Sequence, residues 1–391
     1  MKFDNDNNVL TLYLSGRIDA NNSADIESEI TQVLAENPGL VPVFDASELE
    51  YISSAGLRVL LKFRKQFGKA IDVINASSDV YDIFEVTGFT ELLNVKKKLR
   101  EVSIEGCEVI GGGFYSTVYR LDKDTIVKVF NRAAITLDKI EKDQKIAREV
   151  FVMDIPTAIS YDVVRVGEHY GIVYEMVDAD TIAGTVKKHP ERLSELGRKE
   201  GILLKKLHTT EFPAGALPDA LTKWRDSVDI LHEHEFISAS DADMLHELIN
   251  GIPARHTLIH YDYHPKNILV QDDELILIDV GEASLGHPVI DFSSMYLSAF
   301  LPVRRLGVPS EYMENIIGLN QDELTALWRE MLSAYLKAEI PGWFDDAIEG
   351  YTMIRMLHSM AERLEQPTTQ NTVNFCVSSL KANGLRVMDI L

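Results

Sequence analysis

The stretch His260-Tyr261-Asp262-Tyr263-His264-Pro265-Lys266-Asn267-Ile268-Leu269, followed by Leu275-Ile276-Leu277-Ile278-Asp279, decides the fold of the larger part of this chain. A carboxylate, Asp262, is followed by an amide, Asn267, and by a second carboxylate, Asp279, after an apolar strand. Asp262 can accept or orient the proton of an incoming hydroxyl, and Asn267 and Asp279 offer the oxygen ligands that Mg²⁺ prefers. A polar turn between two strands is the plain alternative, so the interpretation depends on the preceding segments.

Two segments upstream point to a nucleotide. Residues 111–118 (Gly-Gly-Gly-Phe-Tyr-Ser-Thr-Val) fit the pattern G-x-G-x-x-G-x-V, with Ser116 in place of the third glycine. Gly111 and Gly113 would let the backbone approach phosphates, Val118 would cover the adenine, and Lys128 would hold the α- and β-phosphates. A bare hairpin turn or an exposed strand lysine explains each feature alone. Their order before the acid-amide-acid stretch favours a phosphotransferase.

The region from about residue 105 to residue 391 resembles the aminoglycoside phosphotransferase and choline-kinase superfamily, whose loop pattern is H-G-D-x-H-x-x-N followed by I-D. Tyr261 replaces the glycine of that pattern, and Val280 replaces a frequent aromatic residue. The residues that match are His260, Asp262, His264, Pro265, Asn267, Asp279, Gly286, Pro288 and Asp291, the last of which looks structural.

This resemblance implies an α+β, bilobal, protein-kinase-like fold, with an N-lobe over about residues 105–177 and a C-lobe over about 178–391. It implies Asp262 as the catalytic residue, Asn267 and Asp279 as metal ligands, and ATP and Mg as cofactors. Residues 172–177 look like the hinge, where the backbone of Glu175 and Val177 would bind adenine. Asp143 is nearest the position of the acidic partner of Lys128, with Glu141 and Glu149 as rivals.

The first hundred residues alternate strands and helices, which is typical of a compact α/β domain. Strands are predicted over residues 9–14, 41–45 and 71–76. Helices are predicted over 24–35 and 54–66, and a third helical stripe within 79–94 ends near Gly88. The charged stretch 95–105 is interpreted as the domain boundary.

Residues 53–57 (Ser-Ser-Ala-Gly-Leu) stand where a strand and loop give way to a helix. Together with residues 14–19 they make residues 1–97 resemble a STAS domain, the fold of anti-sigma-factor antagonists. Ser54 matches the serine that this family phosphorylates, although Ser53 replaces the family aspartate and Ala55 the second hydroxyl residue. A phosphate at a helix N-terminus would be tolerated there, but helix capping explains a serine equally well.

The bulk composition excludes several classes of function. A formal net charge of −22 repels phosphate backbones, so nucleic-acid binding is not expected. The two cysteines form neither a disulfide framework nor a metal pattern, the N-terminus is not a signal peptide, and no apolar stretch spans a bilayer. We therefore expect a cytoplasmic protein that does not bind membranes.

The leading hypothesis is an ATP- and Mg-dependent phosphotransferase acting on a hydroxyl of a small molecule, with the STAS domain as a regulatory or partner-binding module. One alternative is a regulatory protein kinase that phosphorylates a STAS-domain serine, such as Ser54. Another is a nucleotide-binding, partner-switching scaffold without turnover. The acceptor site is expected among helices after residue 300, where acids would suit an amine; the residues considered are Trp328, Tyr335, Trp343, Asp345, Asp346, Tyr351, Arg355 and His358.

Overall fold

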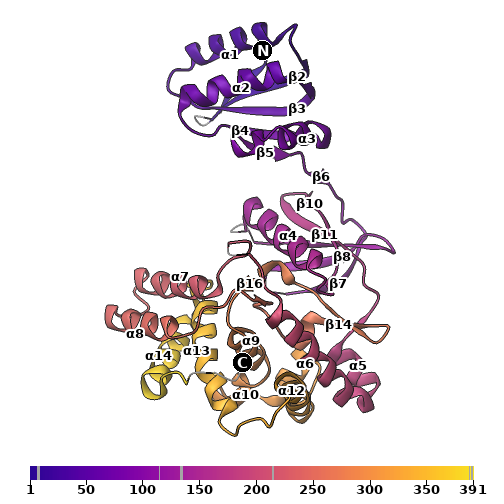
Figure 1. Ribbon diagram of the computed structural model, residues 1–391, viewed down its shortest axis with the longest axis vertical. Helices are drawn as coiled ribbons and strands as arrows, with labels where there is room; N and C mark the ends of the chain where they lie inside the picture. Colours follow the sequence, from indigo (N-terminus) through magenta and orange to yellow (C-terminus); the bar gives the residue numbers. More distant parts are fainter. Residues whose placement is uncertain (7–8, 114, 133–134, 214, 387, 389–390) are drawn as a thin grey trace. The chain divides into compact units, whose positions relative to one another are not determined.

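The computed structural model divides the chain into two compact units, Met1–Val102 and Ser103–Leu391 (Figure 1). It describes all residues except 7–8, 114, 133–134, 214, 387 and 389–390. Each unit is described by itself below.

The first unit is an α/β domain built on one sheet of strand order β1-β2-β3-β4-β5. Strand β1 is antiparallel to β2, and the remaining neighbours are parallel. Its elements are β1 (Phe3–Asp6), β2 (Val9–Ile18), α1 (Ser23–Glu36), β3 (Pro42–Ile52), α2 (Ser54–Phe67), β4 (Asp72–Ala76), α3 (Ser78–Val86), η1 (Phe89–Glu91) and β5 (Asn94–Lys97), followed by the short β6 (Arg100–Glu101). Leu10, Leu12 and Leu14 alternate along β2 and are all buried, as a half-buried strand requires.

At the end of this unit, the helix expected to end near Gly88 ends at Val86. A strand that was not predicted, β5, begins at Asn94 and continues into the stretch interpreted as the domain boundary. Val95 pairs with Val73 of β4 in parallel register, so the sheet gains an edge strand there. Charged residues dominate β5 because an edge strand has a solvent-facing side.

The second unit begins with an antiparallel sheet in which β10, β11, β9, β8 and β7 lie side by side in that order. These strands are β7 (Glu108–Gly112), β8 (Ser116–Arg120), β9 (Thr125–Phe130), β10 (Ser160–Val166) and β11 (His169–Glu175). Helix α4 (Leu137–Val152), which Thr136 caps through the Lys139 N–H, packs against β10 and β11. A small sheet and one adjoining helix therefore form the N-terminal lobe of this unit.

The rest of the second unit is mainly helical and holds its larger apolar core (Figure 1). Its helices are α5 (Ile182–Lys188), η2 (Pro190–Arg192), α6 (Leu193–Thr209), α7 (Ala220–Glu233), α8 (Ala239–Asn250), α9 (Val289–Ala299), α10 (Leu301–Arg305), α11 (Ser310–Ile317), α12 (Gln321–Leu336), α13 (Phe344–Ala361) and α14 (Thr369–Asn383). Between them lie β12 (Asp180–Thr181), β13 (Leu258–Ile259), η3 (Pro265–Asn267), β14 (Ile268–Gln271), β15 (Glu274–Leu277), η4 (Val280–Glu282) and β16 (Ser284–Leu285).

These short strands hold the acid-amide-acid stretch. Strand β13 leads into it and pairs with β16, while β14 and β15 form a hairpin between Asn267 and Asp279. These short strands thus position the loops that carry Asp262, Asn267 and Asp279.

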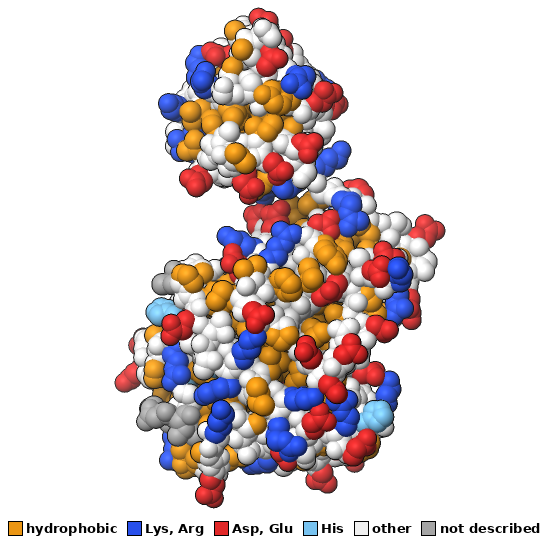
Figure 2. Space-filling view, turned by 45° about the vertical axis from the view of Figure 1, so that its right-hand side comes forward, with side chains coloured by type: hydrophobic (Ala, Val, Ile, Leu, Met, Phe, Trp, Pro, Cys, Tyr) orange, Lys and Arg blue, Asp and Glu red, His pale blue; other side chains and the backbone are white. Residues whose placement is uncertain are grey.

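Within the described residues, no helix combines the length and apolar character needed to cross a bilayer. On the face drawn in Figure 2, acidic and basic side chains are interspersed over both units.

Candidate active site

Asp291 holds the backbone of the loop that carries Asp262 in place. The carboxylate of Asp291 is fully buried in α9 and accepts the backbone N–H groups of His260 (2.8 Å) and Tyr261 (2.7 Å). His260 Nε2 lies 2.9 Å from the Ile278 carbonyl oxygen, directly before Asp279. The aspartate interpreted as structural from the sequence therefore shapes the loop, and His260 links it to the second carboxylate.

The two oxygens of the Asp262 carboxylate face side chains from different segments of the chain. Its Oδ2 faces His264 Nε2 (3.6 Å) and Asn267 Nδ2 (3.5 Å), whereas its Oδ1 faces Arg355 Nη2 (3.5 Å) on α13. Burial acts to raise the pKa of Asp262, but the hydrogen bond and charge of His264 and the charge of Arg355 outweigh it, so the pKa is well below its usual range. The group is therefore a carboxylate at neutral pH.

The structure brings Asn267, Asp279 and Lys128 to the same place. Asn267 is buried, and its Nδ2 donates to the Asp262 carbonyl oxygen (3.0 Å), which leaves its Oδ1 for another partner. The Ile278 N–H donates to the Asn267 carbonyl oxygen (3.0 Å). Because Asp279 is the next residue after Ile278, this bond holds Asp279 near Asn267. Asp279 has a left-handed backbone (φ 60°) and forms an ion pair with Lys128 of β9.

The glycine-rich loop forms the β7–β8 hairpin beside this group. Val118 is the register partner of both Gly111 and Lys128, so these positions line up across three strands. Ser116 is buried, and its carbonyl accepts the Gly113 N–H at 2.9 Å. A Cβ added at Gly113 would meet no atom within 4 Å, so packing within the protein does not require glycine there. Phe114, part of the predicted motif, lies outside the described residues.

The predicted hinge is the end of β11 and the residues after it. The Glu175 N–H donates to the Ile159 carbonyl (2.9 Å), while its Oε1 accepts the Ile159 N–H (2.7 Å), which pins the strand end. The Met176 N–H donates to the Asp124 carbonyl oxygen (2.7 Å), whereas the Val177 N–H makes no backbone hydrogen bond within the described part of the chain.

Asp143 does not meet Lys128. It pairs with Lys139 one turn earlier on α4 (2.7 Å), and Lys139 also contacts Glu282 of η4. Burial and the charge of Glu282 raise the pKa of Asp143 to about 6. A Cβ at Gly281 would lie 2.9 Å from the Asp143 Cβ, so α4 packs tightly on the loop that follows Asp279.

An ionic cluster that sequence reasoning missed lies beside the loop after Asp279. Lys223 of α7 donates to the Glu282 carboxylate (3.0 Å) and carbonyl (3.1 Å), and its ammonium lies 4.1 Å from the centroid of the Tyr261 ring. Lys139, Asp143, Glu282 and Lys223, called the α4–η4–α7 cluster below, come from three distant segments. Only Lys139 and Asp143 are related by a local spacing, so the fold alone reveals that Glu282 and Lys223 join them.

The residues expected around the acceptor separate into two groups. Trp328 and Tyr335 are buried in the core, and Asp345 accepts the Trp328 Nε1–H (3.0 Å) and pairs with Arg329 (2.6 Å). These residues stabilise the helical lobe. Arg355, by contrast, contacts Asp262 directly, and His358 Nε2 lies 3.0 Å from the Tyr261 hydroxyl.

In the first unit, Ser53 rather than Ser54 caps α2. Ser53 Oγ accepts the N–H groups of Ala55 (3.2 Å) and Gly56 (3.5 Å), whereas Ser54 is the first helical residue and is exposed. Capping therefore explains Ser53 and leaves Ser54 unexplained.

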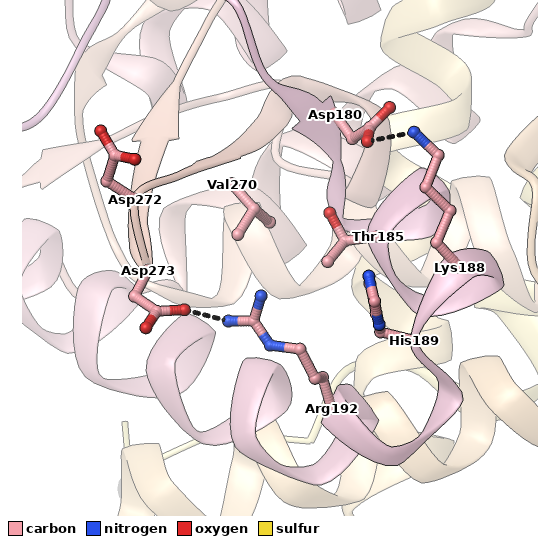
Figure 3. A pocket seen from close by; sticks show the side chains of 8 residues that line it. All are labelled: Asp180, Thr185, Lys188, His189, Arg192, Val270, Asp272 and Asp273. Atoms are coloured by element: carbon pink, nitrogen blue, oxygen red, sulfur yellow. Dashed lines mark hydrogen bonds and ion pairs between the residues drawn. The ribbon is translucent and has the colours of Figure 1, made fainter.

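A surface pocket of about 570 Å³ lies apart from all these residues, between α5 and the β14–β15 turn (Figure 3). Its charged side chains are largely paired with each other: Lys188 with Asp180 (2.6 Å) and Arg192 with Asp273 (2.5 Å). It contains none of the predicted site residues, so the candidate site is defined by the loops described above.

Comparison with known proteins agrees with the two-part organisation. A family model described as the phosphotransferase enzyme family matches residues 106–336, and a model of the STAS domain matches residues 1–102. The N-terminal part is 30% identical over 98 residues to the anti-sigma factor antagonist BtrV of Bordetella bronchiseptica, covering 24% of this chain and 84% of that protein. It is also 34% identical over 65 residues to the anti-sigma-F factor antagonist RsfB of Mycobacterium tuberculosis, covering 17% of this chain and about half (52%) of that one.

Solved structures similar to the chain include the amicoumacin kinase hAmiN (13% identity, 78% of this chain and 96% of that one, TM-score 0.49). Another is a choline/ethanolamine kinase family protein from Mesorhizobium loti (16% identity, 71% of this chain and 87% of that one, TM-score 0.43).

Proposed function

The chain belongs to the phosphotransferase enzyme family and carries an N-terminal STAS domain, and from this we propose that it transfers the terminal phosphoryl group of ATP to a hydroxyl of a small molecule. We further propose Mg²⁺ as its metal and the cytoplasm, where ATP is available, as its location. The STAS domain is proposed as a regulatory or partner-binding module.

One observation carries the proposal: Lys128 of β9 pairs with Asp279, next to Asn267 and Asp262. A lysine, two metal-ligating oxygens and a proton-orienting carboxylate are the parts that phosphoryl transfer requires, since it depends mainly on positioning and charge neutralisation. Gly111, Gly113, Ser116 and Val118 are proposed to cover the nucleotide, with Glu175 and Val177 at adenine. The open space at Gly113 supports close approach by phosphates.

The donor set fits Mg²⁺. Among the described residues, no group of three or more His, Cys, Asp or Glu side chains could hold a metal. Mg²⁺ usually keeps several waters and takes one or two protein oxygens together with substrate phosphates. The Asn267 Oδ1 and the Asp279 carboxylate are proposed as those oxygens, and the bound ion would neutralise charge on the phosphates.

Asp143 is proposed to act indirectly. Its ion pair with Lys139 and its packing on Gly281 support a role in holding α4 against the loop after Asp279.

The test is incubation of the full chain with γ-labelled ATP and Mg²⁺, alone and with aminoglycosides, choline and sugars. Label on a small molecule is the expected result. Tight nucleotide binding without any transfer would instead favour the scaffold without turnover.

A second candidate function is phosphorylation of a STAS-domain serine, and the exposure of Ser54 outside the cap supports it. A phosphate there would lie in the first turn of α2, where the helix dipole favours negative charge. The anti-sigma factor antagonists that match the N-terminal part suggest a protein partner of the anti-sigma-factor class. Label on the protein that is lost in Ser54→Ala, and retained in the matched exposed control Ser47→Ala, would support this function.

A further inference from the structure

Arg355 is a buried cation that the proposed reaction leaves unused. It lies on α13, and its side chain is only 10% exposed. Its neighbours in the sequence, Ile354 and Met356, are also buried. Its Nη1 donates to Ser359 Oγ (2.8 Å) on the next turn, and its guanidinium carbon lies 5.3 Å from the centroid of the Tyr261 ring.

The hydrogen-bonding capacity of this guanidinium is only partly used. Its Nε is buried without a hydrogen-bond partner within the described part of the chain. The Nη2–Oδ1 distance to Asp262 is 3.5 Å, longer than the ~2.7–2.9 Å of a charge-assisted hydrogen bond. A guanidinium removed from water and left with free donors is costly, unless a ligand supplies the missing acceptors.

Arg355 contacts a different oxygen of the Asp262 carboxylate from the one that Asn267 approaches. Asp262 Oδ2 faces Asn267 and His264, whereas Oδ1 faces Arg355. Donor phosphates held by Lys128, Asn267 and Asp279 would lie on the Oδ2 side. Arg355 is therefore on the side from which an acceptor would approach.

Within the described residues, the other polar groups near Arg355 form no ion pair with it, although its charge opposes the rise that burial causes in the pKa of Glu362. Burial, followed by the charge of Arg355, lowers the pKa of His358 to about 3, so His358 is neutral and hydrogen-bonded to Ser227 (2.7 Å). Glu362 lies 3.9 Å from His358 Nε2 and 3.5 Å from the Tyr115 hydroxyl. Within the described residues, the ion pair of Arg355 is the long contact with Asp262 alone.

We propose that Arg355 forms an anion subsite on the acceptor side, so that the hydroxyl acceptor carries a carboxylate or phosphate group close to the hydroxyl that reacts. This inference rests on the proposed function, because it assigns the acceptor side relative to a nucleotide. It reverses the expectation of an acidic pocket for an amine. The planar guanidinium suits a two-oxygen contact with either anion.

The first experiment measures binding without turnover. The full chain is saturated with Mg²⁺ and a non-hydrolysable ATP analogue, and inorganic phosphate is titrated by calorimetry into wild type, Arg355→Gln, Arg355→Lys and Arg198→Gln. Arg198 is a matched control, since it pairs with Glu330 on the surface between α6 and α12. Thermal unfolding checks that each variant is folded.

Phosphate is expected to bind about tenfold more weakly to Arg355→Gln than to wild type, with Arg355→Lys between them and Arg198→Gln unchanged. Equal phosphate affinity in wild type and Arg355→Gln would overturn the proposal. So would a loss of affinity for the ATP analogue in Arg355→Gln, because Arg355 would then serve the donor phosphates.

The second experiment uses turnover with matched acceptors: glycerol, glycerate, glycerol phosphate and choline. Transfer to an anionic member is expected to be at least about tenfold more efficient than to glycerol, and Arg355→Gln should remove that preference by raising KM. Preference for glycerol or choline would overturn the subsite. Failure of the proposed function can be told apart from failure of the anion subsite. If the proposed function fails, the wild-type protein does not bind the ATP analogue. Phosphate binding to the nucleotide-free protein would still show whether Arg355 binds an anion.

Discussion

At the scale of single residues, Tyr261 departs most clearly from the superfamily pattern. It has a left-handed backbone (φ 76°), a conformation that glycine adopts without strain. Its ring is buried beneath the Lys223 ammonium, and its hydroxyl lies 3.0 Å from His358 Nε2. The packing of the side chain offsets the strain of the backbone, so the glycine of the pattern is not needed here.

Tyr261→Gly is therefore expected to destabilise the protein despite relieving the backbone. Losing a buried aromatic side chain costs ~3–5 kcal/mol, and relief of strain returns ~1–3 kcal/mol, so a net loss of about 2 kcal/mol is expected. Urea unfolding measures it, and Tyr261→Phe, which keeps the ring, should lose only about 1 kcal/mol. A glycine variant as stable as wild type would show that the ring contributes little.

Asp262→Ala is expected to abolish phosphoryl transfer while leaving ATP affinity nearly intact, because the carboxylate acts on the acceptor and not on the nucleotide. Calorimetric titration with the ATP analogue, together with labelled-ATP turnover, separates the two effects. Asp262→Asn is the control, because asparagine keeps an oxygen that Arg355 can contact while removing the carboxylate charge. If Asp262→Ala keeps most of the rate, the assignment of the proton-accepting group is wrong.

Glu200 of α6 gives the chain a pH-dependent stability. The carboxyl is fully buried, and burial raises its pKa from 4.5 to about 8, an effect that the nearby Tyr263 hydroxyl offsets only in part. The folded protein therefore keeps a proton that the unfolded chain releases above pH 4.5. Stability from this group is full below that pH and falls as the pH rises through about 8.

Glu200→Gln should remove this dependence, because glutamine stays neutral. Its free energy of unfolding should match wild type near pH 4 and exceed it near pH 9, measured by urea unfolding across that range. Parallel curves for the two proteins would mean that Glu200 ionises normally in the folded state.

At the scale of elements, the α4–η4–α7 cluster joins three segments around the loop after Asp279. Glu282 bonds to both Lys139 and Lys223, and Lys223 in turn lies over Tyr261 beside Asp262. Burial acts to raise the pKa of Glu282, but the two lysines outweigh it and hold the pKa near 2. The cluster thus connects α4 to both proposed metal-binding and proton-accepting loops.

Glu282→Gln should loosen this connection. Because Glu282 is 42% exposed, screening by solvent limits the loss of stability to about 1 kcal/mol. The larger effect should be about tenfold weaker apparent Mg²⁺ affinity in turnover, since the loop carrying Asp279 is less ordered. Glu330→Gln, which breaks a surface ion pair with Arg198, is the matched control and should leave Mg²⁺ dependence unchanged. Unaltered Mg²⁺ dependence in both variants would separate the cluster from the metal.

At the scale of the whole molecule, the two units have separate apolar cores. One core is centred on the sheet of residues 1–102, and the other on the helical lobe. A fragment Ser103–Leu391 should therefore fold alone, bind the ATP analogue like the full chain and unfold cooperatively, as calorimetry would show. An unfolded or aggregated fragment would show that the second unit depends on the first.

The sequence alone determined the local features: the α/β pattern of the first unit, and the order of loop, lysine and acid-amide-acid stretch. These follow from periodicity and short motifs, which depend on neighbours along the chain. Strand β5 was not predicted, because pairing of Val95 with Val73 overrides the charged composition of that stretch.

Only the tertiary structure decided which distant side chains meet. The partner of Lys128 is Asp279, 151 positions away, while Asp143 pairs with Lys139 on its own helix. The contact of Arg355 with Asp262 joins α13 to a loop formed ninety-three residues earlier. Such contacts have no fixed sequence spacing, because they depend on how helices and loops pack, and packing is a property of the folded chain.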